Sequence, residues 1–308
     1  MSFKKRLLRI LFIGSGSVLP AVFLSVAAWA QPVEPGQITA NASFSQLKQY
    51  ESSLDRGGEV DWTGFMAGLN VARQVSAQTS LGFSLRYDYQ DWSWHHLSPG
   101  ATAPWTQIGS PLLGANLSYA FAPGWRFGIA PSVEWSVESG AELGDGLSYG
   151  AIASFTRSYS PDFVIGLGMG AYHEIDREKV FPYLIVRWKL SERWRLGNPL
   201  QAGPAGGAGL ELAYKVSEGW EASGGGSYRS TRFRLSSTGP TPNGLGEYAV
   251  TPVFLRLSRQ VDRATRFDLY AIAMLNGRLA TERADGLETY HDKVQRGTAL
   301  GFTLAHRF

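Results

Sequence analysis

Strict alternation of apolar with small or polar residues runs through long stretches of this chain. In residues 79–92, Leu81 and Phe83 begin a series of apolar positions on one face, while glycine, serine and charged residues take the other. Residues 111–137 repeat the alternation twice, on either side of a short Ala-Pro-Gly turn. A period of two residues predicts β-strands with one apolar face. Because a soluble β-sandwich has the same period, alternation by itself leaves the compartment open.

The length of the alternating segments and the pattern of their connections favour a membrane barrel. The segments run about 10–14 residues, which suits a tilted membrane-spanning strand better than a soluble strand of about five or six. Short turns such as 160–162 alternate with longer polar loops such as 93–107 and 279–296. Outer-membrane barrels have short periplasmic turns, long outer loops and an aromatic girdle. Aromatic residues follow five of the short turns: Trp125, Phe163, Trp194, Trp220 and Phe267.

The fold class predicted from these features is all-β, a transmembrane antiparallel up-and-down β-barrel of about fourteen strands. Segment 194–199 is short for a spanning strand, but without it the later turns fall on the wrong side of the membrane. A barrel of twelve strands, in which this segment and a neighbour form one irregular connection, is the alternative. The expected strands lie near 38–50, 60–74, 79–92, 108–121, 125–137, 147–158, 163–173, 181–190, 194–199, 207–216, 220–235, 247–259, 266–278 and 297–308.

The first thirty residues have the features of a secretory signal peptide. A basic segment with Lys4 and Arg9 precedes an apolar stretch, and Ala28-Trp29-Ala30 forms an A-x-A cleavage site before Gln31. A retained membrane helix is the alternative, although Gly14, Gly16 and Pro20 interrupt the apolar stretch. The sequence therefore predicts a signal peptide over 1–30, a barrel over 31–308, and export to the outer membrane of a Gram-negative bacterium.

Charge and cysteine content narrow the possible partners. Residues 1–30 carry four of the 29 Lys and Arg residues and none of the 26 acidic ones, so residues 31–308 have a net charge close to −1. This balance removes the case for nucleic acid as a partner. The chain has no cysteine, so backbone pairing and burial must hold it together without disulfides.

The alternation continues to the last residue, and this end of the chain carries a specific resemblance. Leu300, Phe302, Leu304 and the terminal Phe308 share one register, with His306 as the exception. The segment LGFTLAHRF resembles the C-terminal signature of bacterial outer-membrane barrels. With VRWKLSERWRLGNP and AGPAGGAGLELAY, the chain also resembles a family of outer-membrane proteins of unknown function. The resemblance implies four partners, namely periplasmic chaperones, the barrel-assembly machinery, outer-membrane lipid and lipopolysaccharide, and leaves the oligomeric state open.

The inward register is expected to hold small and polar residues, including charges of both signs. Such a lumen fits a passive, porin-like channel for small polar solutes, whereas a fully ion-paired interior fits a closed structural or adhesive barrel. The glycines of IGLGMGAY (165–172) are expected to allow close packing inside the curved wall. The candidate lumen charges are Arg86, Asp88, Arg126, Glu134, Glu211, Lys215, Glu221, Arg229, Asp268 and Arg278.

An enzyme is the less favoured alternative. A barrel hydrolase would have its site at the outer rim, where His95, His96, His173 and His291 each lie near an acidic residue. Neighbouring polar residues are nevertheless ordinary in a solvated loop. The loop 281–293 contains four acidic residues but lacks the ordered spacing of a calcium loop. We therefore expect no catalytic residue, no metal and no cofactor.

Overall fold

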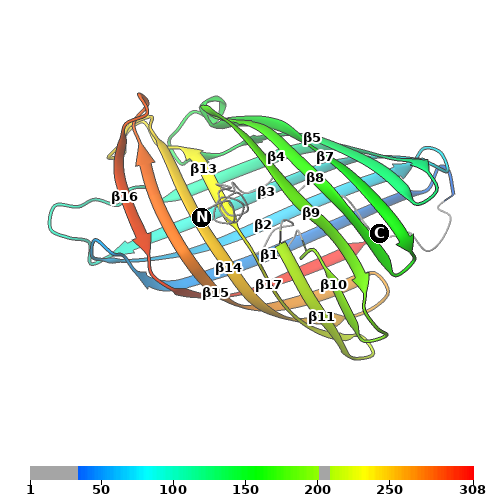
Figure 1. Ribbon diagram of the computed structural model, residues 1–308. Helices are drawn as coiled ribbons and strands as arrows, with labels where there is room; N and C mark the ends of the chain where they lie inside the picture. Colours follow the sequence, from blue (N-terminus) through cyan, green and yellow to red (C-terminus); the bar gives the residue numbers. More distant parts are fainter. Residues whose placement is uncertain (1–33, 201–208) are drawn as a thin grey trace, which may run out of the picture.

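A computed structural model describes residues 34–200 and 209–308, which form a closed barrel of antiparallel strands (Figure 1). The predicted cleavage site with Ala28, Ala30 and Gln31 lies outside the described residues. No helix within the described part of the chain has the length and apolar character needed to cross a membrane. The elements are β1 (Ile38–Ser53), β2 (Glu59–Gln74), β3 (Thr79–His95), β4 (Gln107–Ala122), β5 (Trp125–Trp135), β6 (Val137–Glu138), the short 3-10 helix η1 (Leu143–Gly146), β7 (Leu147–Ser160), β8 (Phe163–Glu174), β9 (Arg177–Lys189), β10 (Trp194–Gly197), β11 (Gly209–Ser217), β12 (Trp220–Ser227), β13 (Arg229–Arg234), β14 (Leu245–Gln260), β15 (Thr265–Glu282), β16 (Glu288–Val294) and β17 (Gly297–Arg307).

The wall has fourteen strands, which confirms the predicted fold and count. Three strands are interrupted: β5 and β6 are separated at Ser136, β12 and β13 at Tyr228, and β16 and β17 at residues 295–296. The short β10 takes part in the wall, because it pairs with β9 on one side and β11 on the other. Its place between these two strands excludes the alternative of twelve.

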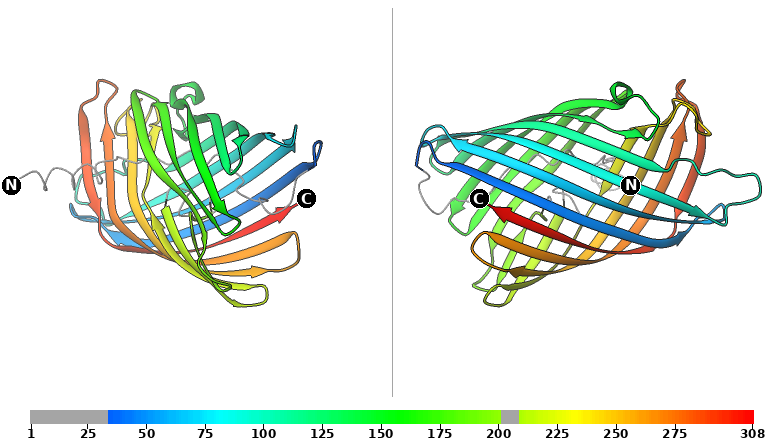
Figure 2. Two further views of the ribbon diagram at one scale, coloured as in Figure 1. Left: turned by 45° about the vertical axis from the view of Figure 1, so that its right-hand side comes forward. Right: turned by 180° about the vertical axis from the view of Figure 1, so that it is seen from behind.

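The first and last strands close the barrel. β1 pairs with β17 from Asn41↔Arg307 to Gln49↔Ala299, so the C-terminal alternation continues the wall without a free edge. The backbone N–H of Phe308 also donates to the carbonyl oxygen of Ala40, at 2.9 Å. The start of β1 and the end of β17 therefore lie at the same end of the barrel, as an even number of strands requires (Figure 2).

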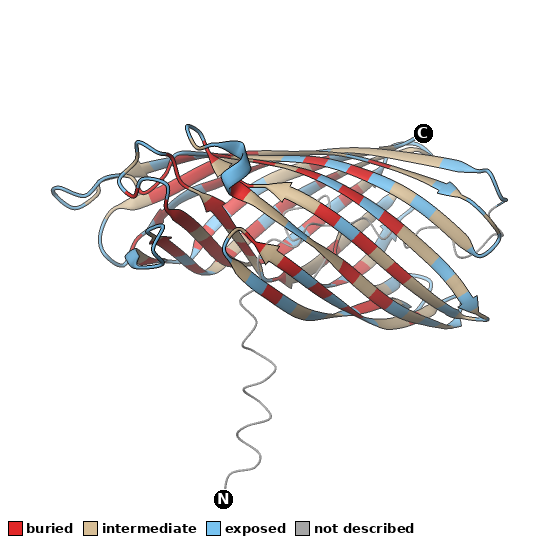
Figure 3. Cartoon of the chain, turned by 90° about the horizontal axis from the view of Figure 1, so that it is seen from above, coloured by how far each residue is buried: buried red, intermediate tan, exposed pale blue. Residues whose placement is uncertain are grey.

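The outer face is apolar and the inner face carries most of the polar side chains. Buried and exposed positions alternate along the strands (Figure 3), and exposed outer side chains include Leu85, Leu167 and Leu255. Two aromatic rings of β9 cover glycines of β8: Tyr183 lies over Gly168, and Phe181 lies over Gly170. A Cβ at either glycine would collide with the ring above it. The glycine run thus lets two aromatic side chains lie flat against the inner wall.

The two ends of the barrel differ. We call the end with the short connections, such as 123–124 and 161–162, the turn end, and the opposite end the loop end. Ring contacts at the turn end join Tyr159 to Phe163, Phe163 to Trp188, and Trp194 to Tyr214, with centroids 5.7, 5.1 and 4.7 Å apart. These rings lie beside short turns, as the predicted interfacial girdle requires.

The strands extend further at the loop end than the sequence predicted. The expected loop 279–296 is largely a hairpin, because β15 runs to Glu282 and β16 begins at Glu288. β9 begins at Arg177, so the expected loop 174–180 is only a tight turn. Exposed charged side chains such as Glu178, Arg278 and Glu288 interrupt the apolar half of the alternation there, so the pattern that marks the spanning strands is incomplete in these segments.

Inside the loop end, an apolar cluster fills the space between opposite walls. Trp62, Trp92 and Trp105 meet Phe233 and Tyr248 there: the rings of Trp92 and Tyr248 are 4.9 Å apart and those of Trp105 and Phe233 are 5.2 Å apart. Next to the cluster, Arg234 of β13 forms a single parallel bridge with Val137 of β6. The expectation of a uniformly small and polar inner face is therefore wrong in this part of the barrel.

Candidate functional site

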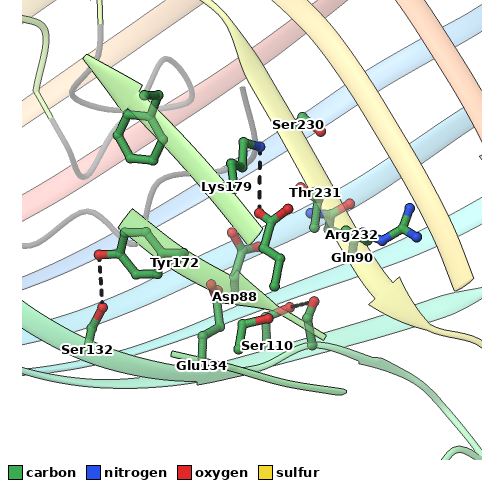
Figure 4. Close-up of a pocket in the computed structure, with 14 residues that line it drawn as sticks. Asp88, Gln90, Ser110, Ser132, Glu134, Tyr172, Lys179, Ser230, Thr231 and Arg232 are labelled. Carbon is green, nitrogen blue, oxygen red and sulfur yellow. Dashed lines mark hydrogen bonds and ion pairs between the residues drawn. The ribbon is translucent and has the colours of Figure 1, made fainter. Parts of the chain in front are cut away.

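A polar pocket lies in the loop-end half of the lumen, beside the apolar cluster (Figure 4). It opens to solvent, and its walls come from β3, β4, β5, β7, β8, β9 and β13. Hydroxyl groups are frequent in its lining: five serines, one threonine and Tyr172 face it. The Tyr172 hydroxyl lies 3.2 Å from the Ser132 hydroxyl, so the phenol is held against the wall. Charged residues complete the lining: Asp88, Glu134, Glu174, Lys179 and Arg232.

Ion pairs between strands hold most of these charges. Arg86 Nη2 is 3.1 Å from Glu134 Oε1, and both side chains are largely buried. Arg229 Nη2 is 3.9 Å from Asp88 Oδ2, which joins β13 to β3 across the lumen. Lys179 Nζ is 3.6 Å from Glu174 Oε1. Charges of opposite sign therefore face each other across the pocket, and pairing offsets the cost of removing them from water.

Arg232 links four segments at the top of the pocket. Its side chain is 2% exposed. Its guanidinium donates to both carboxylate oxygens of Asp176, each at 3.0 Å, to Glu282 at 2.7 Å, and to Glu247 at 3.3 Å. Arg177 reaches the same Glu247, at 3.1 Å. The β8–β9 turn is thus tied to β13, β14 and β15 by charge-assisted hydrogen bonds rather than by strand pairing.

A second buried network lies in the turn-end half, on the inner face of β11, β12, β14 and β15. Arg256, with a side chain 1% exposed, contacts Glu211, lies 3.1 Å from Glu221 Oε1, and lies 3.5 Å from Asp268 Oδ1. Asp268 also accepts hydrogen bonds from Arg266 and Ser258. This network binds four strands together but lines no part of the pocket described above.

The predicted lumen charges divide between these two networks. Arg86, Asp88, Glu134 and Arg229 belong to the pocket network, and Glu211, Glu221 and Asp268 to the second one. Arg126 donates to Ser118 at 2.9 Å, nearer the turn end. Lys215 is exposed close to the end of β11.

The predicted inward position of Arg278 is wrong. It was expected inside the lumen, but its side chain is 57% exposed and pairs with Glu288. The reason is a bulge, in which Asn276 and Gly277 of β15 lie opposite Val250 alone. Asn276 has a positive φ of 54°. One extra residue exchanges the two faces of a strand, so the inward register after the bulge is Gly277 and Leu279.

Several network residues were not among the predicted lumen charges. Glu174, Lys179, Arg232, Glu247 and Arg256 all have buried or largely buried side chains. Arg256 could have been found, because it lies between Leu255 and Leu257 in the same register as Ser258. For Arg232 the sequence gives no comparable signal, since two of its partners, Asp176 and Glu282, lie 56 and 50 positions away.

The histidines considered for hydrolysis do not gather at one place, since His95 lies beside Asp61 and His96 beside Glu59. His173 pairs with Glu178 and His291 lies near Glu288, at separate places on the rim. In the acidic loop, Glu282 binds Arg232, whereas Asp292 accepts from the Tyr290 hydroxyl. In the C-terminal segment predicted to act as an assembly signal, Leu300 and Leu304 are exposed on the outer face, Phe302 packs beside Phe44 and Phe267, and Phe308 is 74% exposed.

Comparison with known proteins gives similarity at the level of fold. No family model matches the chain, and no curated protein matches it. Similar solved structures include an outer-membrane channel from Pseudomonas putida F1, with 11% identity, 92% of this chain and 100% of that chain covered, and a TM-score of 0.48. The P. putida toluene transporter TodX has 10% identity, 91% and 93% coverage and a TM-score of 0.43. The KdgM porin has 10% identity, 86% and 99% coverage and a TM-score of 0.34. The fold itself, a closed antiparallel barrel of fourteen strands, is the one predicted from the sequence.

Proposed function

We propose that the protein is a passive outer-membrane channel for small polar solutes, with its turn end in the periplasm. The observation that carries the proposal is a set of buried polar atoms on the inner face of β2, β3 and β4. Asn70 Nδ2, Ser84 Oγ and Asn116 Nδ2 have no hydrogen-bond partner among the described residues. Buried polar groups without a protein partner require water. A hydrated inner face below the charged pocket supports a polar path along this half of the lumen.

The paired charges set the expected character of such a channel. Because charges of both signs face each other across the pocket, the path should be narrow and only weakly selective. Glu134 lies in the pocket lining and is paired with Arg86. Neutralising Glu134 would leave the arginine charge uncompensated and should shift selectivity toward anions.

Conductance across planar lipid bilayers tests the proposal. The purified protein should give a steady ohmic current, and the reversal potential in a KCl gradient should move toward anion preference in Glu134→Gln. The matched control is Glu142→Gln, an exposed carboxylate before η1 that should leave selectivity unchanged. Protein with the heat-modifiable mobility of a folded barrel but no current would contradict the channel.

A closed structural barrel is the second candidate. It is favoured by the apolar cluster, which packs opposite walls together with Trp105 only 1% and Phe233 0% exposed. The same bilayer experiment separates the two functions, because a barrel filled by this cluster and by ion pairs would stay silent. Neither proposal assigns a catalytic residue. Both retain the expectation that the assembly machinery recognises the C-terminal strand and that lipopolysaccharide surrounds the loop end.

A further inference from the structure

Three potential metal ligands from three adjacent strands converge on the outer face at the loop end. We propose that Glu51 of β1, Asp61 of β2 and His95 of β3 bind a divalent transition-metal ion of the zinc class. One ligand atom from each residue lies within 4.8 Å of the other two, and no other group of three or more such side chains converges in this way within residues 34–200 and 209–308. The inference concerns the outer wall and is independent of whether the lumen conducts.

The backbone explains why these three side chains meet. A β-bulge interrupts the β1–β2 pairing, so Tyr50 and Glu51 together lie opposite Asp61 alone. Bulges of this kind redirect a side chain relative to its neighbours. On the other side of Asp61, the pairing of β2 with β3 places Ser93 directly opposite, and His95 two residues further along the same face. The ligands therefore stand on a rigid sheet rather than on flexible loops.

The position already attracts positive charge. The ammonium group of Lys48 contacts Asp61 Oδ1, and His95 Nε2 lies 2.9 Å from Asp61 Oδ2. The Asp61 side chain is 8% exposed although it lies on the outer face. A lysine ammonium thus occupies the place of a bound cation, and a metal ion would displace it from the carboxylate.

The donor set decides the class of metal. Imidazole suits zinc, copper and nickel, whereas magnesium and calcium prefer a shell of oxygen ligands. Two carboxylates and one imidazole supply three ligands, which leaves one position of a tetrahedral zinc site open. Rings of Phe65 and Tyr89 pack 5.4 Å apart further along the same outer face. The open position therefore faces outward on the loop-end side of these aromatic rings, the level at which lipid headgroups are expected.

Zinc binding to the detergent-purified full-length protein tests the inference by isothermal titration calorimetry. We expect one zinc ion per chain, with binding abolished in His95→Ala and weakened in Glu51→Gln, while a large excess of Mg²⁺ should not compete. Lys48→Met removes the competing ammonium and should tighten binding about two- to fivefold, because an exposed ion pair is worth little in water.

The matched control is His173→Ala, which removes a rim histidine that pairs with only one carboxylate, Glu178. This variant should bind zinc as the unaltered protein does. Each variant is first checked for heat-modifiable mobility, so that only folded barrels are compared. Unchanged zinc binding in folded His95→Ala, equal loss in His173→Ala, or equal competition by Mg²⁺ would overturn the assignment, and weaker binding in Lys48→Met would contradict the role given to the ammonium.

Discussion

Replacing Arg256 with methionine should destabilise the barrel by about 3 kcal/mol, through loss of a buried charge rather than loss of volume. Removing one partner of a buried ion pair costs about 3–5 kcal/mol, because the remaining charge stays buried and uncompensated. Glu211 is 4% exposed, and among the described residues Arg256 is the one cation within salt-bridge distance of it. Asp268 keeps Arg266 at 2.9 Å, so the expected cost lies near the lower limit.

Urea unfolding in lipid vesicles, followed by tryptophan fluorescence, measures this cost. The transition midpoint should fall while the slope of the transition stays constant, because the surface exposed on unfolding is unchanged. The double variant Arg256→Met/Glu211→Leu should recover most of the lost stability, since an apolar pair can replace a buried ion pair. The control Arg259→Met removes an arginine of the same strand that stacks on Trp220 at 5.1 Å on the outer face, and should cost about 1 kcal/mol or less. Equal effects of Arg256→Met and Arg259→Met, or no recovery in the double variant, would refute the reasoning.

Three further outcomes are expected. Leu167→Arg introduces a charge at a lipid-facing position that is 67% exposed, so the urea midpoint should report a loss of about 2–4 kcal/mol, whereas Leu167→Phe should have little effect. Phe308→Asp should reduce the amount of heat-modifiable barrel in membrane fractions, and a normal yield would contradict the assembly role of this residue. Hydrogen bonds from the backbone N–H groups of the β14–β15 turn lower the pKa of Asp262. Its stabilisation should therefore be present above the unfolded pKa and disappear as pH falls through the lower folded pKa, and an unchanged acid profile in Asp262→Ala would exclude it.

The strand framework could be predicted because alternation reports which face of a strand meets lipid. This pattern placed every spanning strand. The requirement for an even number of strands was the reason to count the short β10 among them. Alternation does not report where a bulge lies, and for this reason Arg278 was assigned to the wrong face. Alternation also does not show the positive φ at Asn276, although asparagine adopts positive φ more readily than most other residues.

The networks across the lumen were beyond sequence reasoning for a different reason. The inward register of β2 and β3 shows Trp62 and Trp92, but it does not show that the opposite wall approaches closely enough for Tyr248 to touch them. Likewise, Arg229 could be assigned to the lumen from its register, whereas its partner Asp88 lies on a strand six positions away around the wall. Such contacts depend on the cross-section of the barrel, which local patterns do not encode.

The seam between β1 and β17 also determines when the molecule can become complete. All the other long antiparallel pairings join spanning strands that follow each other in the chain, whereas the Ser45–Thr303 hydrogen bond in the seam spans 258 positions. Hairpins of successive strands can form before the whole chain is present. The ring of strands, however, closes only when β17 is available to pair with β1. Until then both edge strands present unpaired backbone groups, which hydrocarbon does not tolerate. A chain without β17 would remain an open sheet, so the wall cannot close before the strand that pairs with both β1 and β15 is in place.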